Sequence, residues 1–129
     1  MNEIKIREYC LSLPEATEDF PFGSDIKVFK IKNKMFGLML KQQGEMRINL
    51  KCDPDEALDL RKIYPAILPG YHMNKKHWNT LTLNGSVPIS EIENMIDNSY
   101  NLVVNSLKKR DKVSLEKKYG KTYFENEFL

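Results

Sequence analysis

Apolar residues recur at helical spacing close to the N-terminus. Four of them lie three or four positions apart: Ile6, Tyr9, Cys10 and Leu13. This spacing places them on one face of a helix and predicts an amphipathic helix over residues 3–13. Pro14 follows, and a proline disfavours helical backbone at the residue before it. The helix should therefore end at residue 13 or just before it.

The next segments have the composition of strands. Residues 15–23 are extended and turn-rich, whereas residues 26–31 are rich in apolar and β-branched side chains and residues 35–40 are apolar apart from one glycine. The latter two are separated by Lys32, Asn33 and Lys34, a connection of hairpin length in which asparagine tolerates positive φ. The pattern predicts a β-hairpin.

Residues 45–51 alternate between apolar and polar side chains. The apolar set is Met46, Ile48 and Leu50, and the polar set is Arg47, Asn49 and Lys51. Because successive side chains of a strand point to opposite faces, this alternation predicts a third strand with one buried face and one solvated, basic face.

A helix start follows the third strand. Asp53 in the N-cap position, Pro54 at the first helical position and Glu56 at the third are the components of a capping box. The helix should end near Tyr64, because Pro65 follows it. A loop over residues 66–77 then leads into a strand at 79–83, where threonine and leucine alternate.

The last regular element has the broadest apolar stripe. Ser90 and Glu93 form a second capping box, and apolar residues continue at helical spacing as far as Leu107. We expect a helix of about 20 residues that ends in Lys108, Lys109 and Arg110, where cations suit the negative end of the helix dipole. Beyond it, a short helix is expected around residues 115–119, capped by Gly120.

The predicted order of elements is α-β-β-β-α-β-α. Strands that follow one another through tight turns pair antiparallel, so the order predicts a two-layer α+β fold in which an antiparallel sheet packs against helices. No linker divides the chain. We expect one domain over residues 1–110 and a C-terminal tail over residues 111–129.

Several segments resemble the MmcQ/YjbR family. The most specific is PGYHMNKKHWNTLTLNGSVP, followed by the helix EIENMIDNSYNLVVNSL. The segments REYCLSLPEATEDFPFG, VFKIKNKMFGLML and INLKCDPDEALDLR support it in order, so the resemblance spans roughly residues 3–110. It implies a YjbR-like fold similar to that of secretion chaperones. Members are often labelled DNA-binding by analogy of fold, and the family implies no agreed catalytic residues.

Composition is that of an ordinary globular protein, with 41% hydrophobic and 29% charged residues. No apolar run approaches the ~20 residues that span a bilayer, and the N-terminus lacks the apolar stretch of a signal peptide. We therefore expect a cytoplasmic protein with no membrane association, and favour a monomer. Cys10 and Cys52 lie 42 positions apart without a CxxC or CxxH pattern, which predicts free buried thiols.

Charge is unevenly distributed. The net charge is +2, yet residues 1–23 carry 2 basic and 5 acidic side chains, whereas residues 24–52 carry 7 basic and 2 acidic ones. Segregation of this kind usually means that one solvated face of a sheet is basic, and sometimes that the face binds a polyanion.

The loop before the last strand concentrates rings and cations within eight positions: Tyr71, His72, Lys75, Lys76, His77 and Trp78. Lysines could bind phosphates while the aromatic faces stack on bases. In the competing interpretation, Trp78 is a core aromatic at the start of a strand, Tyr71 packs the loop, and the lysines are merely solvated. The sequence leaves both open.

The leading hypothesis is a small non-enzymatic domain that binds nucleic acid, DNA in particular. Its phosphate contacts would be Arg47, Lys51, Lys75 and Lys76, and Tyr71 or Trp78 would stack on bases, with the two histidines nearby. The alternative is a protein-interaction module with a chaperone-like fold and a protein partner. A small-molecule binder or enzyme ranks last.

No cofactor, metal or catalytic residue is expected. His72 and His77 would need a third metal ligand from elsewhere in the chain. A helix N-terminus could lower the pKa of the Cys52 thiol, but the sequence places no base beside it, so a structural thiol is favoured. The acidic residues Glu15, Glu18, Asp19 and Asp25 fall in a turn-rich stretch typical of a solvated face.

Overall fold

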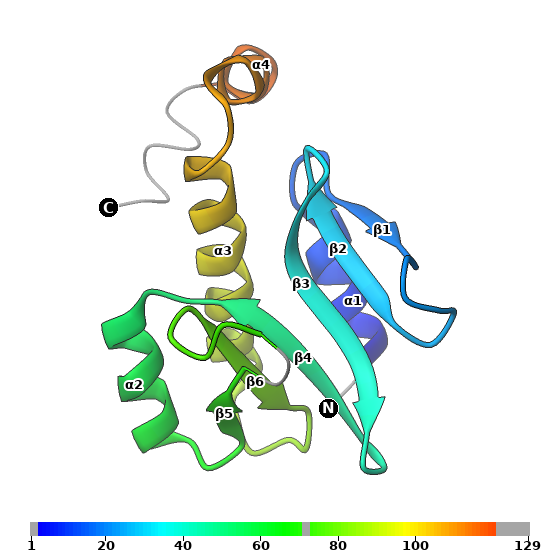
Figure 1. Ribbon diagram of the computed structural model, residues 1–129, viewed down its shortest axis with the longest axis vertical. Helices are drawn as coiled ribbons and strands as arrows, with labels where there is room; N and C mark the ends of the chain where they lie inside the picture. Colours follow the sequence, from blue (N-terminus) through cyan, green and yellow to red (C-terminus); the bar gives the residue numbers. More distant parts are fainter. Residues whose placement is uncertain (1–2, 71–72, 121–129) are drawn as a thin grey trace.

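The computed structural model describes residues 3–70 and 73–120 (Figure 1). Its helices are α1 (Glu3–Ser12), α2 (Pro54–Ile63), α3 (Ile89–Asn105) and α4 (Lys109–Tyr119). Its strands are β1 (Thr17–Asp19), β2 (Lys27–Ile31), β3 (Lys34–Gln42), β4 (Glu45–Lys51), β5 (Ile67–Pro69) and β6 (Trp78–Thr82). The strands form one sheet in the order β1-β2-β3-β4-β6-β5, and every neighbouring pair is antiparallel.

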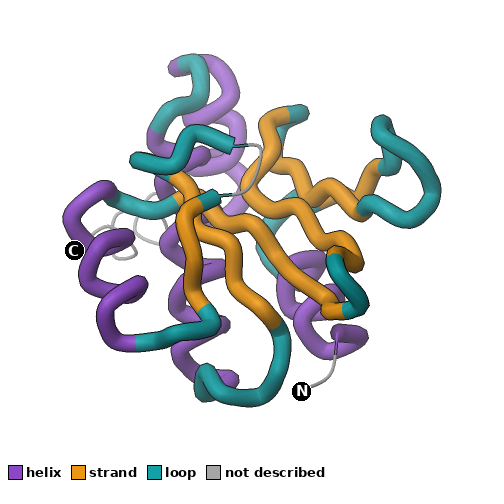
Figure 2. The backbone as a smooth tube through the Cα atoms, turned by 60° about the horizontal axis from the view of Figure 1, so that its bottom comes forward, coloured by secondary structure: helices purple, strands orange, loops and turns teal. Residues whose placement is uncertain are grey.

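The helices α1 and α3 pack together on one face of the sheet, and α2 lies at the end formed by β5 and β6 (Figures 1 and 2). The core is the apolar layer between α3 and the central strands, where Ile48, Leu50 and Leu81 meet Ile92 and Ile96. The predicted two-layer α+β class is therefore confirmed, and its predicted order of elements is retained.

Two local predictions are confirmed in detail. The β2–β3 connection is a two-residue turn in which Lys32 and Asn33 both have positive φ, 49° and 66°, as a hairpin turn of type I′ requires. Helix α2 begins as expected: the Asp53 side chain accepts hydrogen bonds from the backbone N–H groups of Asp55 at 3.2 Å and Glu56 at 3.3 Å.

The structure adds two short strands to the predicted set. Residues 17–19, within a stretch expected to be extended and turn-rich, pair with β2, and residues 67–69, expected to lie in a loop, pair with β6. Each strand has only three residues, too few for an alternation of apolar and polar positions to be recognised in the sequence.

The predicted helix of about 20 residues ends earlier than expected, whereas the short helix expected around residues 115–119 and capped by Gly120 is confirmed as part of α4. Helix α3 begins at Ile89 after an N-cap at Pro88 with no side-chain cap bond, so Ser90 caps nothing, and it ends at Asn105. A separate helix α4 starts at Lys109. The cations expected at the C-terminal end of one helix therefore lie at the start of the next, and the expected domain boundary at Arg110 falls inside α4.

Side-chain hydrogen bonds join the first and last thirds of the domain. The Tyr9 hydroxyl lies 2.8 and 2.9 Å from the two carboxylate oxygens of Asp97, and the Tyr100 hydroxyl donates to the backbone oxygen of Pro14 at 2.7 Å. In addition, Arg7 forms a two-pronged ion pair with Glu18 at 2.6 and 2.8 Å, which ties α1 to β1. The arginine holds the pKa of the Glu18 carboxyl below its usual value.

Ser99 of α3 is fully buried and connects two strands that diverge. The last paired residues of β3 and β4 at this end are Gly37 and Leu50. One position beyond them, the Ser99 hydroxyl accepts a hydrogen bond from the Lys51 N–H at 2.9 Å and donates to the Phe36 backbone oxygen at 2.5 Å. The hydroxyl thus bridges two backbone groups that can no longer bond to each other because the strands have separated.

None of the helices in the described parts of the chain is both long enough and apolar enough to cross a membrane.

Candidate functional site

The antiparallel register assigns each side chain of β4 and β6 to one face of the sheet. Directly opposed residues point to the same face, and alternate residues point to opposite faces. Because Ile48, Leu50 and Leu81 face the core below α3, their neighbours in the sequence form the other face. We call this the outer face and define it by Leu40, Arg47, Asn49, Lys51, Trp78, Thr80 and Thr82.

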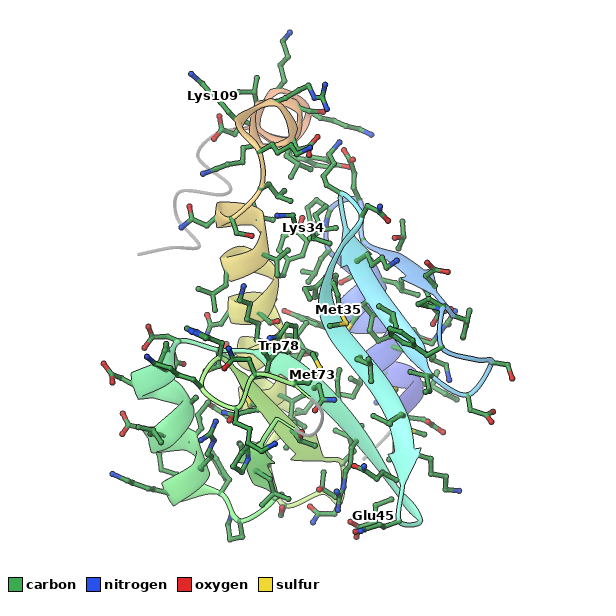
Figure 3. All side chains as sticks on the ribbon, in the orientation of Figure 1. Lys34, Met35, Glu45, Met73, Trp78 and Lys109 are labelled. Atoms are coloured by element: carbon green, nitrogen blue, oxygen red, sulfur yellow. The ribbon has the colours of Figure 1, made fainter. Side chains whose placement is uncertain are left out.

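Lys51 and Trp78 are directly opposed at one end of the outer face. Arg47 lies on the same face, opposite Leu40 on one side and Thr82 on the other. Figure 3 shows Trp78 where β6 begins, beside the end of β4. The register therefore places three of the predicted site residues, Arg47, Lys51 and Trp78, on one face, with Lys51 and Trp78 adjacent and Arg47 four residues along β4 from Lys51.

The expectation that this face is solvated is wrong at its centre. Asn49 is 3% exposed and Thr80 is 1% exposed, and the Thr80 hydroxyl donates a hydrogen bond to the Asn49 side-chain oxygen. The neighbouring Leu38, opposite Asn49, is also buried. Alternation in the sequence distinguishes the two faces but cannot tell whether neighbouring side chains cover the polar one.

Arg47 is largely engaged within the fold. Its side chain is 14% exposed, with one guanidinium nitrogen 3.2 Å from the Gln42 side-chain oxygen and the other 3.6 Å from the Glu45 carboxylate. Its Nε is buried without a hydrogen-bond partner. Arg47 is thus less available to an external anion than an exposed lysine.

The turn over residues 73–77 enters β6 next to Lys51. The backbone oxygen of His77 accepts a hydrogen bond from the Cys52 N–H at 2.7 Å, which fixes the turn to the end of β4. Lys75 and Lys76 are exposed, and the Lys75 ammonium lies 3.3 Å from the Gly70 backbone oxygen. Tyr71 and His72, both predicted site residues, lie outside the described residues.

Arg61 of α2 holds this turn, and sequence reasoning missed it. Its Nε donates to the Asn79 side-chain oxygen at 2.7 Å, and its Nη2 donates to the backbone oxygen of Lys75 and lies 3.4 Å from that of Trp78. An arginine near the C-terminus of a helix resembles a solvated cation that complements the helix dipole, so the sequence carries no signal for this role.

The lysines around Trp78 lack acidic partners. Within the described chain, Lys51, Lys75 and Lys76 form no ion pair, in contrast to Lys30 and Lys32, which pair with Asp19 and Glu15 at 3.0 Å. These three lysines adjoin Trp78 in the strand pairing or along the chain, and the acidic residues Asp53, Asp55 and Glu56 follow Lys51 at the start of α2.

Comparison with known proteins identifies the family of this chain. The YjbR family model matches residues 11–102, which include every strand and helices α2 and most of α3. The chain belongs to the YjbR family.

Relatives of this YjbR domain cover most of its length. It is 43% identical over 105 residues to the uncharacterized protein YbdF of Escherichia coli O157:H7, an alignment that covers 81% of this chain and 86% of that protein. It is 30% identical over 103 residues to the uncharacterized protein YjbR of Escherichia coli K12, with 80% and 87% covered. Neither name indicates a ligand or a reaction.

Solved structures confirm the YjbR fold. A crystal structure of a Deinococcus radiodurans protein with a DUF419 domain superposes with a TM-score of 0.80 at 37% identity, over 88% of this chain and 87% of that one. A crystal structure of a Pseudomonas syringae protein gives a TM-score of 0.72 at 31% identity, over 79% and 98%.

The basic segment 24–52 does not form one face of the YjbR domain, contrary to the expectation from its charge. Lys32 lies in the β2–β3 turn and contacts α4, Lys34 is the first residue of β3, and Lys51 lies beside Trp78. In the antiparallel register Lys41 and Arg47 lie toward the other end of β3 and β4, so the cations of this segment are spread along the strands.

Both cysteines of the YjbR domain are free and buried, as predicted. Burial is the main cause that raises the pKa of each thiol to about 12, and at Cys52 the nearby carboxylates of Glu56 and Asp53 contribute to this value. The two thiols are therefore protonated at neutral pH, and neither is an activated nucleophile. No group of three or more potential metal ligands exists among residues 3–70 and 73–120.

Proposed function

We propose that this protein binds nucleic acid, without catalysis, through the Lys51–Trp78 end of the outer face and the adjoining 73–77 turn. The supporting observation is the register that opposes Lys51 to Trp78, beside exposed Lys75 and Lys76, with no acidic partner for these three lysines within the described chain. Ammonium groups bind phosphates, and an aromatic ring beside them offers a stacking surface to a base.

The division of roles follows from exposure. Lys75 and Lys76 are exposed and supply the first phosphate contacts, and half-buried Lys51 supports them. Arg47 contributes mainly long-range potential, because its guanidinium is occupied by Gln42 and Glu45. Trp78 is half-buried, so a base would stack on the exposed part of its ring.

Replacing Lys75 and Lys76 together by alanine should weaken binding to single-stranded and duplex DNA of many sequences alike. Each lost phosphate contact reduces the slope of log affinity against log salt by about 0.7 for single strands and 0.9 for duplex, so the slope should fall by roughly 1.5. Fluorescence anisotropy with labelled oligonucleotides over a range of salt concentrations measures both quantities.

The matched control replaces Lys5 and Lys62, two exposed cations of α1 and α2, by alanine. It removes the same charge from positions outside the proposed site and should leave the salt dependence nearly unchanged. Native protein that shows no binding at about 50 mM salt, where electrostatic contacts are strong, would disprove the proposal.

A protein partner is the second candidate, and exposed apolar side chains favour it. Leu58 and Ile63 of α2 and Leu68 of β5 are 51%, 63% and 42% exposed, at the end of the sheet where α2 packs on β5. A contact site on these elements requires that such side chains form one contiguous patch.

If this surface binds protein, it should also support weak self-association at high concentration. Sedimentation velocity at rising concentration tests this, with Ile63→Glu and Leu68→Glu as variants that should remain monomeric. Identical sedimentation of native protein and variants at every concentration would argue against the second candidate.

A further inference from the structure

Helix α4 lies beyond residue 102, where the family match ends, at the end of the molecule that carries the β2–β3 turn (Figure 1). Leu115 is its one buried side chain among the described residues. Polar contacts complete the attachment: the Lys32 ammonium lies 3.4 Å from the Ser114 hydroxyl, and Glu15 pairs with Lys32 at 3.0 Å and Lys118 at 3.9 Å. The helix is therefore held at a fixed place beside the turn.

This end of the protein carries far more positive charge than the chain as a whole. We define the α4 basic surface by its eight cations: Lys32, Lys34, Lys108, Lys109, Arg110, Lys112, Lys117 and Lys118. The acidic residues in the same segments are Glu15, Asp111 and Glu116. Eight cations against three acids give a balance of +5, and since the whole chain carries +2, all other residues together carry −3.

Most of these cations are free to meet a ligand. Lys34, Lys108, Lys109, Arg110 and Lys117 are all exposed and form no ion pair within the described chain. Figure 3 shows Lys34 and Lys109 at the same end of the molecule. Uncompensated charge of one sign gathered at one end attracts a polyanion from a distance.

One side of α4 is also hollowed. Arg110, Val113, Ser114, Lys117 and Lys118 line a shallow depression of about 500 Å³. Arg110, Ser114 and Lys117 are spaced by four and three residues, so they share one helical face and extend over about 10 Å of helix axis. Guanidinium, hydroxyl and ammonium groups are the side-chain donors that proteins use most on phosphate oxygens.

The apolar residues of α4 argue against a membrane surface as the ligand. A helix that lies in a bilayer needs a broad apolar face. In α4 Leu115 is buried in the core and Tyr119 packs against it, which leaves Val113 as the exposed apolar side chain, 45% exposed. The helix thus presents charge and hydroxyl groups rather than a face that inserts.

We infer that the α4 basic surface is a second binding site, one that takes the phosphodiester backbone of a nucleic acid. This second site binds the same class of ligand as the site of the proposed function. It lies at a different position, because Lys75, Lys76 and Trp78 lie outside α4 and the β2–β3 turn. Its contacts are to phosphate alone, so it adds affinity without preference for sequence.

The test replaces Lys109, Arg110 and Lys117 together by glutamine in the full chain. Glutamine has a helix propensity close to that of lysine and arginine, so α4 should remain folded, which circular dichroism checks. With a labelled single-stranded oligonucleotide, affinity at low salt should fall at least tenfold, and the slope of log affinity against log salt should decrease by about 2. A charge-matched control changes Lys5, Lys41 and Lys62, three exposed cations elsewhere, to glutamine.

Each outcome decides between the two sites. A fall in affinity for the α4 variant that the control does not share supports the inference, whatever the Lys75 and Lys76 variant does. An unchanged α4 variant beside a weakened Lys75 and Lys76 variant overturns the inference and leaves the proposed function standing. Equal losses of affinity in the α4 variant and the control indicate that only the net charge of the protein matters. That result also overturns the inference. Native protein that sediments with phosphatidylserine vesicles but binds no oligonucleotide removes both.

Discussion

Replacing Ser99 by alanine should lower the free energy of unfolding by about 2–4 kcal/mol. The hydroxyl is fully buried and satisfies two backbone groups, the Lys51 N–H and the Phe36 oxygen, where β3 and β4 no longer pair with each other. Leaving a buried donor or acceptor without a partner costs about 1–3 kcal/mol, and alanine would leave both without one. Urea denaturation followed by circular dichroism measures the change.

Ser90→Ala is the matched control on the same helix. Ser90 is exposed and lies in the first turn of α3, where it makes no cap bond, so its loss should change stability by less than about 0.5 kcal/mol. If Ser99→Ala and Ser90→Ala unfold at the same urea concentration, the hydroxyl of Ser99 does not support the divergent strands.

Replacing Gly70 by alanine should destabilise the domain by about 1–3 kcal/mol and weaken nucleic-acid binding as well. A Cβ atom at this position would lie 2.7 Å from the Trp78 Cβ, 3.0 Å from the Trp78 backbone oxygen and 3.1 Å from the Met73 Cβ. Overpacking of this kind forces backbone shifts of that cost. The shift would break the 2.9 Å hydrogen bond from the Gly70 N–H to the Trp78 oxygen, and the 73–77 turn would move.

Gly37→Ala is a suitable comparison because Gly37, like Gly70, is buried. Gly37 lies within β3. There the nearest atom to a new Cβ would be Phe29 Cδ2 at 3.4 Å, an ordinary contact, so the loss of stability should be smaller. Urea denaturation and anisotropy titrations on both variants separate the effects. Gly70→Ala that retains native stability and affinity would show that the turn adapts without cost.

The sequence predicts those elements whose signals are local. Asp53 and Pro54 mark the start of α2 because a side-chain oxygen and a missing N–H act within one turn of backbone. The β2–β3 hairpin is equally local, since two residues with positive φ reverse the chain by themselves. The resemblance to the YjbR family supports the α+β class, while the order of strands in the sheet is not determined by short-range patterns.

The break between α3 and α4 could not be read from the pattern of apolar residues. Leu107 continues the stripe and is indeed buried, yet the helix ends at Asn105 and Lys108 adopts extended backbone with ψ of 147°. Neither proline nor glycine marks the place. The spacing of apolar residues indicates which side chains reach the core. It does not show where the helix ends, because a chain that has left the helix can still bury the next apolar residue.

The candidate site was only partly accessible to sequence reasoning for a related reason. Alternation correctly assigned Arg47 and Lys51 to one face, and the loop composition drew attention to Lys75, Lys76 and Trp78. The burial of Asn49 depends on cross-strand neighbours, and the role of Arg61 depends on a turn 14 residues away. Both are tertiary effects that composition and spacing do not encode.

The hydrogen bonds of Tyr9 to Asp97 and of Tyr100 to Pro14 join residues separated by 88 and 86 positions. Synthesis proceeds at about 5–20 residues per second, so α1 emerges roughly 4–18 s before the helix on which it packs. Loop closure over such a separation must be achieved before these contacts stabilise anything. During translation the N-terminal segment therefore cannot form its contacts with α3 until that helix has been synthesised.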